Sequence, residues 1–236
     1  MIELKNIVKS YSGVEVLNTP ELNIRKGESF GLVGNNGAGK TTMFRCILDL
    51  IRPDSGEVLI KDINVAKSEE WKMVTGSYLD DGFLIDFLTP DEYFRFVADV
   101  YGLSEGDINV FYDEFDEFFN NEIKGKKKLI RDLSSGNRQK IGIAAALMPQ
   151  PEVLVLDEPF NSLDPSTQIR LKKLLKTLKE EKEVSMLISS HDLNHVTEVC
   201  ERIVVLHEGK IAHDIKTSKD TLKDLESYFA VDSEEN

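Results

Sequence analysis

The sequence has no long uninterrupted run of apolar residues. In its 236 residues the longest apolar stretch is 141–148, and Gly142 interrupts even that one. A membrane-spanning helix needs about 20 consecutive apolar residues, so we expect no span in this chain. The first ten residues, MIELKNIVKS, lack the apolar segment of a signal peptide. This pattern favours a cytoplasmic location.

Cysteines are also scarce, and basic residues are outnumbered by acidic ones. The two cysteines, Cys46 and Cys200, stand far apart in helical contexts, which predicts reduced, buried thiols instead of a disulfide framework. There are 29 Lys and Arg against 42 Asp and Glu, and the formal net charge is −13. Such a charge disfavours non-specific binding to nucleic acids and to anionic membranes, so no nucleic-acid partner is expected. We interpret the basic run at 124–128 as a solvated face or a contact with an acidic partner.

Strands and helices alternate over most of the chain. The first thirty residues read as short, half-exposed strands with a turn at Ser12. The continuous apolar run 153–156 is typical of a strand buried on both faces of a parallel sheet. After it come a helix from Pro165 and strands at 184–189 and 203–206. The alternation predicts an α/β fold with a mostly parallel sheet. The apolar side of the helix from Pro165 is expected to contain Leu171, Leu174, Leu175 and Leu178.

The middle of the chain has a helical pattern. Thr89, Pro90 and Glu92 form the signature of a helix start with a capping box. Together with the aromatic spacing that follows, this predicts a helical segment inserted at about 85–148. We interpret both apolar faces of the segment as core rather than as a ligand site. The first face consists of Tyr93, Phe96, Val97 and Val100, and the second of Phe111, Phe115, Phe118 and Phe119.

A glycine-rich loop follows the apolar strand that ends at Val33. Residues 34–41 read GNNGAGKT, which matches the phosphate-binding (Walker A) pattern between a strand and a helix predicted at 41–50. Backbone N–H groups of such a loop surround phosphate oxygens, the Lys40 ammonium reaches the β- and γ-phosphates, and the Thr41 hydroxyl can ligate Mg²⁺. The expected nucleotide-binding residues of this loop are Gly34, Asn35, Asn36, Gly37, Ala38, Gly39, Lys40, Thr41 and Thr42.

A second acidic element, LVLDEP at 154–159, ends the buried strand. A carboxylate at this place, Asp157, can hold Mg²⁺ through water. The next one, Glu158, is placed to act as general base for an attacking water. An acidic turn after a strand is common, so this element alone is weaker evidence than the glycine-rich loop.

Three further segments, taken with the two motifs above, indicate a protein family. They read LSSGNRQK at 133–140, FNSLDP at 160–165 and SSHD at 189–192. With these motifs in this order, the chain resembles the ATPase subunit of ATP-binding cassette (ABC) transporters over about residues 1–225. The resemblance implies a P-loop NTPase fold with a mostly parallel core sheet, an N-terminal antiparallel β-subdomain and an inserted helical subdomain.

The resemblance also implies how the chain is divided. Residues 1–225 are expected to form a single ABC ATPase domain, followed by a short acidic tail at 226–236. Within the domain, 1–84 and 149–225 would form the catalytic α/β core, and 85–148 the helical subdomain with the signature.

The same resemblance implies partners and roles. Two such subunits, identical or paired with a second ABC ATPase, close head to tail around two Mg-ATP molecules and power transport by separate membrane-spanning permease subunits. The chain would then sit on the inner face of the membrane through that partner. The signature residues Ser134, Ser135, Gly136 and Asn137 would face the nucleotide of the other subunit, with Ser134 and Gly136 bonding its γ-phosphate. Asp164 would belong to the loop linking the sites, Tyr11 would stack on adenine, and Lys40, Glu158 and His191 would be catalytic.

Two departures from the family pattern affect these expectations. The signature reads LSSGN where LSGGQ is usual, but the phosphate-contacting positions Ser134 and Gly136 are retained. The family usually places a glutamine that touches Mg²⁺ and the membrane partner where this chain has Asp81. An aspartate there could still ligate Mg²⁺, through water, while the coupling to the membrane partner would be altered.

Other interpretations remain for comparison. A soluble ABC ATPase acting on ribosomes or DNA usually has two cassettes or a long inserted coiled coil, and this chain has neither pattern. A cassette that binds ATP as a regulator without turnover is disfavoured by the retained Glu158 and His191. The spacing of His191 and His195 is compatible with a zinc site, but the glutamate of a zinc-binding helix motif is lacking.

Overall fold

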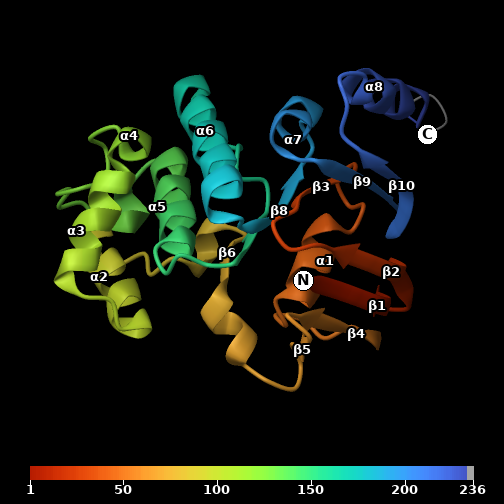
Figure 1. The fold of residues 1–236 in the computed structure, drawn as a ribbon, viewed down its shortest axis with the longest axis horizontal. Coiled ribbons are helices and arrows are strands. Elements are labelled where there is room, and N and C mark those ends of the chain that lie inside the picture. Colours follow the sequence, from red (N-terminus) through yellow and green to blue (C-terminus); the bar gives the residue numbers. More distant parts are fainter. Residues whose placement is uncertain (233–236) are drawn as a thin grey trace.

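Two β-sheets form the framework of the protein in the computed structural model, which describes residues 1–232. The remaining residues of the predicted tail, 233–236, lie outside the described residues. Figure 1 shows the smaller sheet and the C-terminal strands at one end of the molecule and a group of helices at the other. The predicted α/β fold class is confirmed.

The smaller sheet is antiparallel and has the strand order β2-β1-β4-β5. Ser12 and Gly13, both at positive φ, make the tight turn between β1 and β2. Pro20 lies in β2 at the edge of the sheet, where its missing N–H breaks no ladder between two neighbours. The separate short strands predicted before residue 25 are therefore one long hairpin. The strands are β1 (Ile2–Tyr11), β2 (Val14–Ile24), β4 (Ser55–Ile60) and β5 (Ile63–Asn64).

The larger sheet has the order β10-β9-β3-β8-β7-β6 and is parallel except for the edge strand β10. Every residue of β3, β7 and β8 is buried, as expected for strands covered on both faces. Since these three strands are neighbours and parallel, their carboxyl ends meet at one edge. The strands are β3 (Ser29–Val33), β6 (Thr75–Tyr78), β7 (Val153–Leu156), β8 (Ser185–Ser190), β9 (Arg202–His207) and β10 (Lys210–Lys216).

Helices and 3-10 turns precede or follow the strands of the larger sheet. Helix α1 ends earlier than the predicted 41–50, because the chain turns at Asp49, which has a positive φ. The predicted apolar side of α6 is confirmed, since its four leucines are buried or packed on the core. The elements of this group are α1 (Lys40–Ile47), η1 (Glu70–Val74), η2 (Asp81–Phe83), α6 (Pro165–Lys182), α7 (Leu193–Val199) and α8 (Thr221–Asp232).

The middle of the chain is helical, and its predicted capping box is present. Thr89 accepts a hydrogen bond from the Glu92 N–H, and the Glu92 carboxylate accepts one from the Thr89 N–H. One predicted apolar face was partly wrong: Phe96 and Val100 are 47% and 63% exposed. Phe94, which the spacing did not include, is buried there instead. The elements are α2 (Pro90–Tyr101), α3 (Glu105–Glu114), α4 (Asp116–Phe119), η3 (Ile130–Asp132) and α5 (Ser135–Leu147).

The phenylalanine cluster of the helical segment is confirmed as core. Phe111, Phe115, Phe118 and Phe119 are all buried, and the Phe111 and Phe115 ring centroids are 4.7 Å apart. This cluster shares one apolar core with α5, α6 and one face of the larger sheet. The helical segment is thus packed onto the sheet through α5 and α6.

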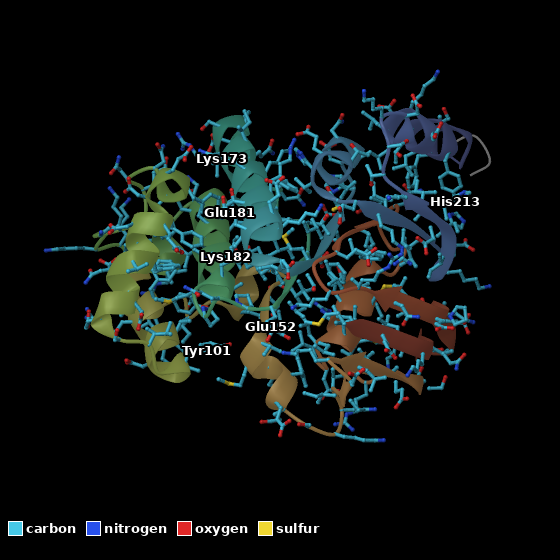
Figure 2. All side chains as sticks on the ribbon, viewed as in Figure 1. Tyr101, Glu152, Lys173, Glu181, Lys182 and His213 are labelled. Carbon is cyan, nitrogen blue, oxygen red and sulfur yellow. The ribbon has the colours of Figure 1, made fainter. Side chains whose placement is uncertain are left out.

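Charged side chains of helix α6, among them Lys173, Glu181 and Lys182 labelled in Figure 2, lie at the surface of the protein. Lys173 and Lys182 pair with Glu117 and Glu114 of the helical segment, at 2.9 and 3.6 Å.

Both cysteines are buried and free, and burial raises the pKa of Cys46 to about 11. Among residues 1–232, no helix has both the length and the apolar character needed to cross a bilayer.

Candidate functional site

The phosphate-binding loop lies between β3 and α1, where the sequence predicts it. Gly39 has φ +104°, and a Cβ there would lie 2.7 Å from the Val16 carbonyl oxygen, so only glycine fits. The Lys40 ammonium donates to the carbonyl oxygens of Gly34 (2.7 Å) and Asn35 (3.4 Å). Lys40 is 7% exposed, whereas Asn35, Asn36 and Gly37 are exposed at the tip of the loop. The loop therefore presents exposed backbone next to a buried cation.

Lys40 also faces two carboxylates of the next motif. Its Nζ lies 3.9 Å from Glu158 Oε1. Burial lowers the pKa of the Lys40 ammonium, and the charges of Glu158 and Asp157 oppose that effect. The parallel order β3-β8-β7 brings these groups together, because the loop after β3 and the carboxylates after β7 lie at the same edge of the sheet.

Asp157 and Thr41 meet across this edge. The Thr41 hydroxyl donates to Asp157 Oδ2 at 2.6 Å, and Asp157 Oδ1 accepts a hydrogen bond from the Ser189 hydroxyl. Asp157 is 6% exposed. A hydroxyl and a carboxylate oxygen are ligands of the kind that Mg²⁺ prefers, so Thr41 and Asp157 fit a magnesium site.

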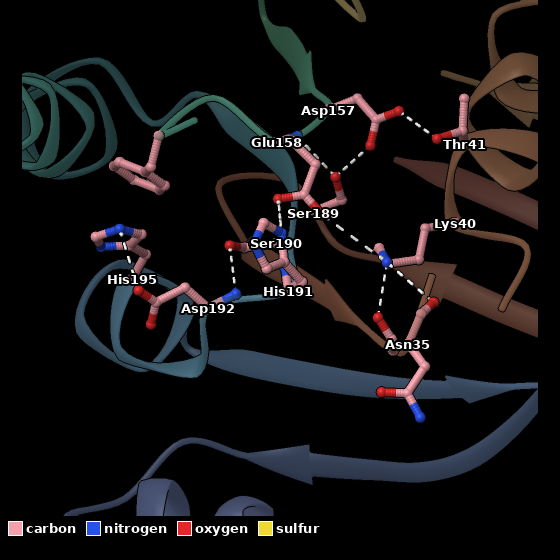
Figure 3. Close-up of polar contacts among 12 residues, drawn as sticks. Asn35, Lys40, Thr41, Asp157, Glu158, Ser189, Ser190, His191, Asp192 and His195 are labelled. Carbon is pink, nitrogen blue, oxygen red and sulfur yellow. Dashed lines mark hydrogen bonds and ion pairs between the residues drawn. The ribbon is translucent and has the colours of Figure 1, made fainter. Parts of the chain in front are cut away.

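Glu158 and His191 form the second pair of the site (Figure 3). His191 Nδ1 is 2.9 Å from Glu158 Oε2, and the His191 N–H donates to the same oxygen at 3.3 Å. His191 directly follows β8, and Glu158 is the second residue after the end of the neighbouring strand β7. His195 lies apart from this pair, with its ring 4.4 Å from that of Phe160 and its Nε2 3.5 Å from Asp192. The two histidines thus have different partners.

Asp81 is directed at a different partner. Its Oδ2 accepts a hydrogen bond from Arg138 Nε at 2.6 Å, so its carboxylate forms an ion pair with the signature helix α5. Thr41 and Asp157 contact each other as described above, and the structure shows Asp81 bound to α5 instead of to either of them. Asp81 as a magnesium ligand therefore stays a prediction that this arrangement does not support.

The signature residues stand at the exposed start of α5. Ser134 is the N-cap of the helix, and its hydroxyl oxygen accepts a hydrogen bond from the Asn137 N–H at 3.2 Å. Ser134 and Ser135 are exposed, while Gly136 and Asn137 are half-buried. Exposed hydroxyl and N–H donors at a helix N-terminus suit an anion brought by another molecule.

Two more predicted residues are exposed on other elements. Tyr11 is 47% exposed at the end of β1, with the Lys9 ammonium 5.5 Å from its ring centroid. Asp164 is the N-cap of α6 and accepts hydrogen bonds from the N–H groups of Ser166 and Thr167. Hydrogen bonds from the hydroxyls of these two residues are the main cause that holds the pKa of Asp164 well below its usual range.

Sequence reasoning assigned no role to Ser189 and Gln139. Ser189 accepts a hydrogen bond from the Glu158 N–H at 2.9 Å, and Gln139 Nε2 donates to the Glu158 carbonyl oxygen at 3.2 Å. Gln139 is a buried polar residue on α5, 5% exposed. A polar residue leading into the apolar run 141–148 is the only local signal that could have drawn attention to it.

Comparisons with known proteins agree with this geometry. A family model described as "ABC transporter" matches residues 17–161. The bacitracin transport ATP-binding protein BcrA of Bacillus licheniformis is 34% identical over 221 residues, which cover 91% of this chain and 69% of BcrA. The phosphonates import ATP-binding protein PhnC of Wolinella succinogenes is 35% identical over 230 residues, covering 91% and 82%.

A solved structure is also similar over nearly the whole chain. The ATP-binding cassette MJ0796, a dimer in a post-hydrolysis state bound to ADP and Pi, has a TM-score of 0.83 and 28% sequence identity. The similarity covers 92% of this chain and 99% of that one.

Proposed function

This chain belongs to the ABC transporter family as an ATP-binding and ATP-hydrolysing subunit, and from that premise we propose which residues carry out the reaction. The observation that carries the proposal is the meeting of Lys40, Asp157, Glu158 and His191 at the carboxyl ends of β3, β7 and β8. The geometry supports in-line attack of water on the γ-phosphate of ATP.

The phosphate loop binds and orients the triphosphate. The N–H groups of the exposed residues 35–37 and of the N-terminus of α1 donate hydrogen bonds to phosphate oxygens, and Lys40 neutralises charge on the β- and γ-phosphates. Thr42 adds a hydroxyl near the α-phosphate. Tyr11 stacks on adenine, because its half-exposed ring is free to present one face to a flat base.

Glu158 acts as the general base and His191 holds it in place. The 2.9 Å contact from His191 Nδ1 fixes the carboxylate, and the opposite edge of the imidazole is then directed away from Glu158, toward the γ-phosphate and the water. Thr41 and Asp157 would hold Mg²⁺. When bound, Mg²⁺ neutralises charge on the β- and γ-phosphate oxygens.

The second half of each site comes from another cassette. The MJ0796 structure is a dimer, and Ser134 and Gly136 at the exposed start of α5 suit the γ-phosphate of a nucleotide held by a second copy or a related ATPase subunit. Asp164, in the loop after Glu158, lies next to that interface. Closure of the dimer then completes the site and excludes water other than the attacking one.

The membrane-spanning subunits dock in an aromatic groove beside β6. This groove of about 370 Å³ is lined by Trp71, Tyr78, Phe83, Tyr93 and Tyr101 from η1, β6, η2 and α2 (Tyr101 is labelled in Figure 2). Phe83 is 58% exposed. Trp71 and Tyr78 are buried in the wall of the groove, and Phe83 exposes an aromatic ring beside them. Exposed apolar surface at a groove is typical of a protein-binding site, and we assign this one to the permease subunits. Such a contact would hold the chain at the inner face of the membrane.

A soluble ABC ATPase acting on ribosomes or DNA is the competing function. The relatives described above are ATP-binding proteins of bacitracin transport and of phosphonates import, and this similarity favours transport. Co-purification distinguishes the two, because a hydrophobic membrane subunit supports transport and ribosomes or DNA support the alternative.

The role of Glu158 is tested by Glu158→Gln. This variant should bind ATP, accumulate a closed dimer and hydrolyse ATP about 10²- to 10⁴-fold more slowly, the range for loss of a general base. The matched control is Glu152→Gln, since Glu152 lies just before β7, at the opposite end of the same strand. Phosphate release measures turnover. Turnover by Glu158→Gln close to that of the wild type would refute the assignment of the base.

A further inference from the structure

The backbone of Glu158 has an unusual conformation. Its φ is +49°, in the left-handed region that residues with a Cβ rarely occupy. Such a conformation persists when neighbouring groups hold it, and it then directs the side chain in a way that an extended or helical backbone would not. The groups that hold the two polar atoms of the Glu158 backbone therefore act together with His191 in setting where its carboxylate points.

Those groups come from two different parts of the protein. The Glu158 N–H donates to Ser189 Oγ at 2.9 Å, and Ser189 belongs to the neighbouring strand β8. The Glu158 carbonyl oxygen accepts from Gln139 Nε2 at 3.2 Å, and Gln139 belongs to the signature helix α5. The Asn161 N–H, in the loop just after Glu158, donates to the same oxygen at 3.2 Å, so Gln139 is its donor from outside this loop. A carbonyl oxygen only accepts, so the amide nitrogen of Gln139 must face it. The peptide of the proposed base is thus bound on one side by the sheet and on the other by α5.

Helix α5 approaches this segment closely at a second point. A Cβ on Gly136 would lie 2.6 Å from the Ser162 carbonyl oxygen, so the backbones of the signature and of the loop after Glu158 are in direct contact. Gly136 and Gln139 are three positions apart and therefore share one side of the helix. One side of α5 consequently packs along the segment from Glu158 to Ser162.

We propose that Gln139 is a positioning residue, which couples the signature helix to the general base of the same chain. This inference rests on the proposed role of Glu158. The first turn of α5 is the surface that we assign to the partner's nucleotide, through Ser134 and Gly136. A shift of α5 on dimer closure is then transmitted through the Gln139 amide to the Glu158 peptide, and the base becomes aligned only when the signature is engaged.

The test is steady-state ATP hydrolysis by the full chain carrying Gln139→Met. Methionine keeps the length and volume of the buried side chain and removes the donor. We expect kcat to fall about tenfold, the effect of one lost hydrogen bond on the transition state, and KM for ATP to stay within about twofold. Gln139→Asn retains an amide that is one methylene group too short, and it should lower kcat in the same way if the methionine variant folds poorly.

The chain offers a matched control in Gln168. Its Nε2 donates to the Phe160 carbonyl oxygen at 3.0 Å, in the same segment but two residues beyond the base. Gln168→Met should leave kcat within about twofold. An equal loss of kcat in both methionine variants would show that the whole segment, and not the peptide of Glu158, requires support, and would overturn the proposal.

A double-mutant cycle separates positioning from a general structural effect. In Glu158→Gln there is no base to align, so adding Gln139→Met should not slow the residual hydrolysis further in single-turnover measurements. If the double variant instead loses activity by the product of the two single-variant factors, the positioning role is refuted. If Gln139→Met keeps the wild-type kcat while Glu158→Gln hydrolyses ATP slowly, this inference is overturned and the assignment of the base stands. Fast turnover by Glu158→Gln would overturn both.

Discussion

Removing the carboxylate of Glu122 should destabilise the protein, because it leaves a buried charge without its partner. Lys140, on α5, is 2% exposed, and its Nζ lies 2.9 Å from Glu122 Oε2. Glu122→Gln keeps the shape of the side chain and removes only its charge. The variant therefore measures how much the buried ammonium depends on this single carboxylate.

The magnitude follows from the burial of the two partners. Breaking a fully buried pair costs about 3–5 kcal/mol, but Glu122 is 42% exposed, so water compensates in part. We expect the free energy of unfolding to fall by about 1–2 kcal/mol. The matched control is Glu117→Gln, which breaks a pair with Lys173 of the same 2.9 Å length in which the side chains are 68% and 64% exposed. That loss should be much smaller, since solvent screens an exposed pair.

Urea unfolding at several pH values measures both losses. The hydrogen bond from Lys140 is the main cause that lowers the pKa of Glu122 in the folded state. A lowered folded pKa gives stability that is present above the unfolded pKa and is lost as the pH falls through the folded pKa. The difference between wild type and Glu122→Gln should therefore be full at pH 7 and shrink below about pH 4. Equal losses for Glu122→Gln and Glu117→Gln at pH 7 would refute the argument from burial.

Two further predictions concern binding. Tyr11→Ala should weaken ATP binding about fivefold, the loss of roughly 1 kcal/mol of stacking, whereas Tyr11→Phe should bind as the wild type does in a fluorescent-nucleotide titration. An unchanged affinity in the alanine variant would place adenine elsewhere. Phe83→Asp should abolish co-purification with the membrane subunit without lowering the melting temperature. Val110→Asp, at an apolar residue 54% exposed on α3 and outside the groove, should keep the complex.

Much of this fold could be predicted from local patterns in the sequence. The capping box at Thr89, the turn at Ser12 and the buried strand 153–156 depend on residues close to one another in the chain, and the structure has all three. The phosphate loop is of the same kind, because a strand, glycines, Lys40 and a helix follow in one continuous segment. Glu158 and His191 meet because β7 and β8 are neighbours in the sheet. The sequence predicts this meeting only through the resemblance to the family, because the spacing of the two residues does not reveal the strand order.

What the sequence could not predict depends on contacts between distant segments. The helical period placed Phe96 and Val100 on the buried face, but the helix turns Phe94 toward the phenylalanine cluster instead, and the 5.0 Å Phe94–Phe111 centroid distance shows the reason. Likewise Asp81 forms its ion pair with Arg138, which lies 57 positions along the chain. In both cases the partner lies far away in the sequence, so no local pattern of residues could have predicted the contact.

The net charge of −13 does not prevent the binding of a phosphate at the site. At physiological ionic strength exposed charges are screened over about 8 Å, so the acidic surface acts weakly on a phosphate held in the loop. Lys40 is 7% exposed and lies within hydrogen-bond reach of the loop's own carbonyls, where screening is small. The carboxylates of Asp157 and Glu158 act at the same short range, and Asp157 fits Mg²⁺. A strongly acidic protein can therefore bind a polyanion, because the groups that contact the phosphates and not the total charge decide the affinity.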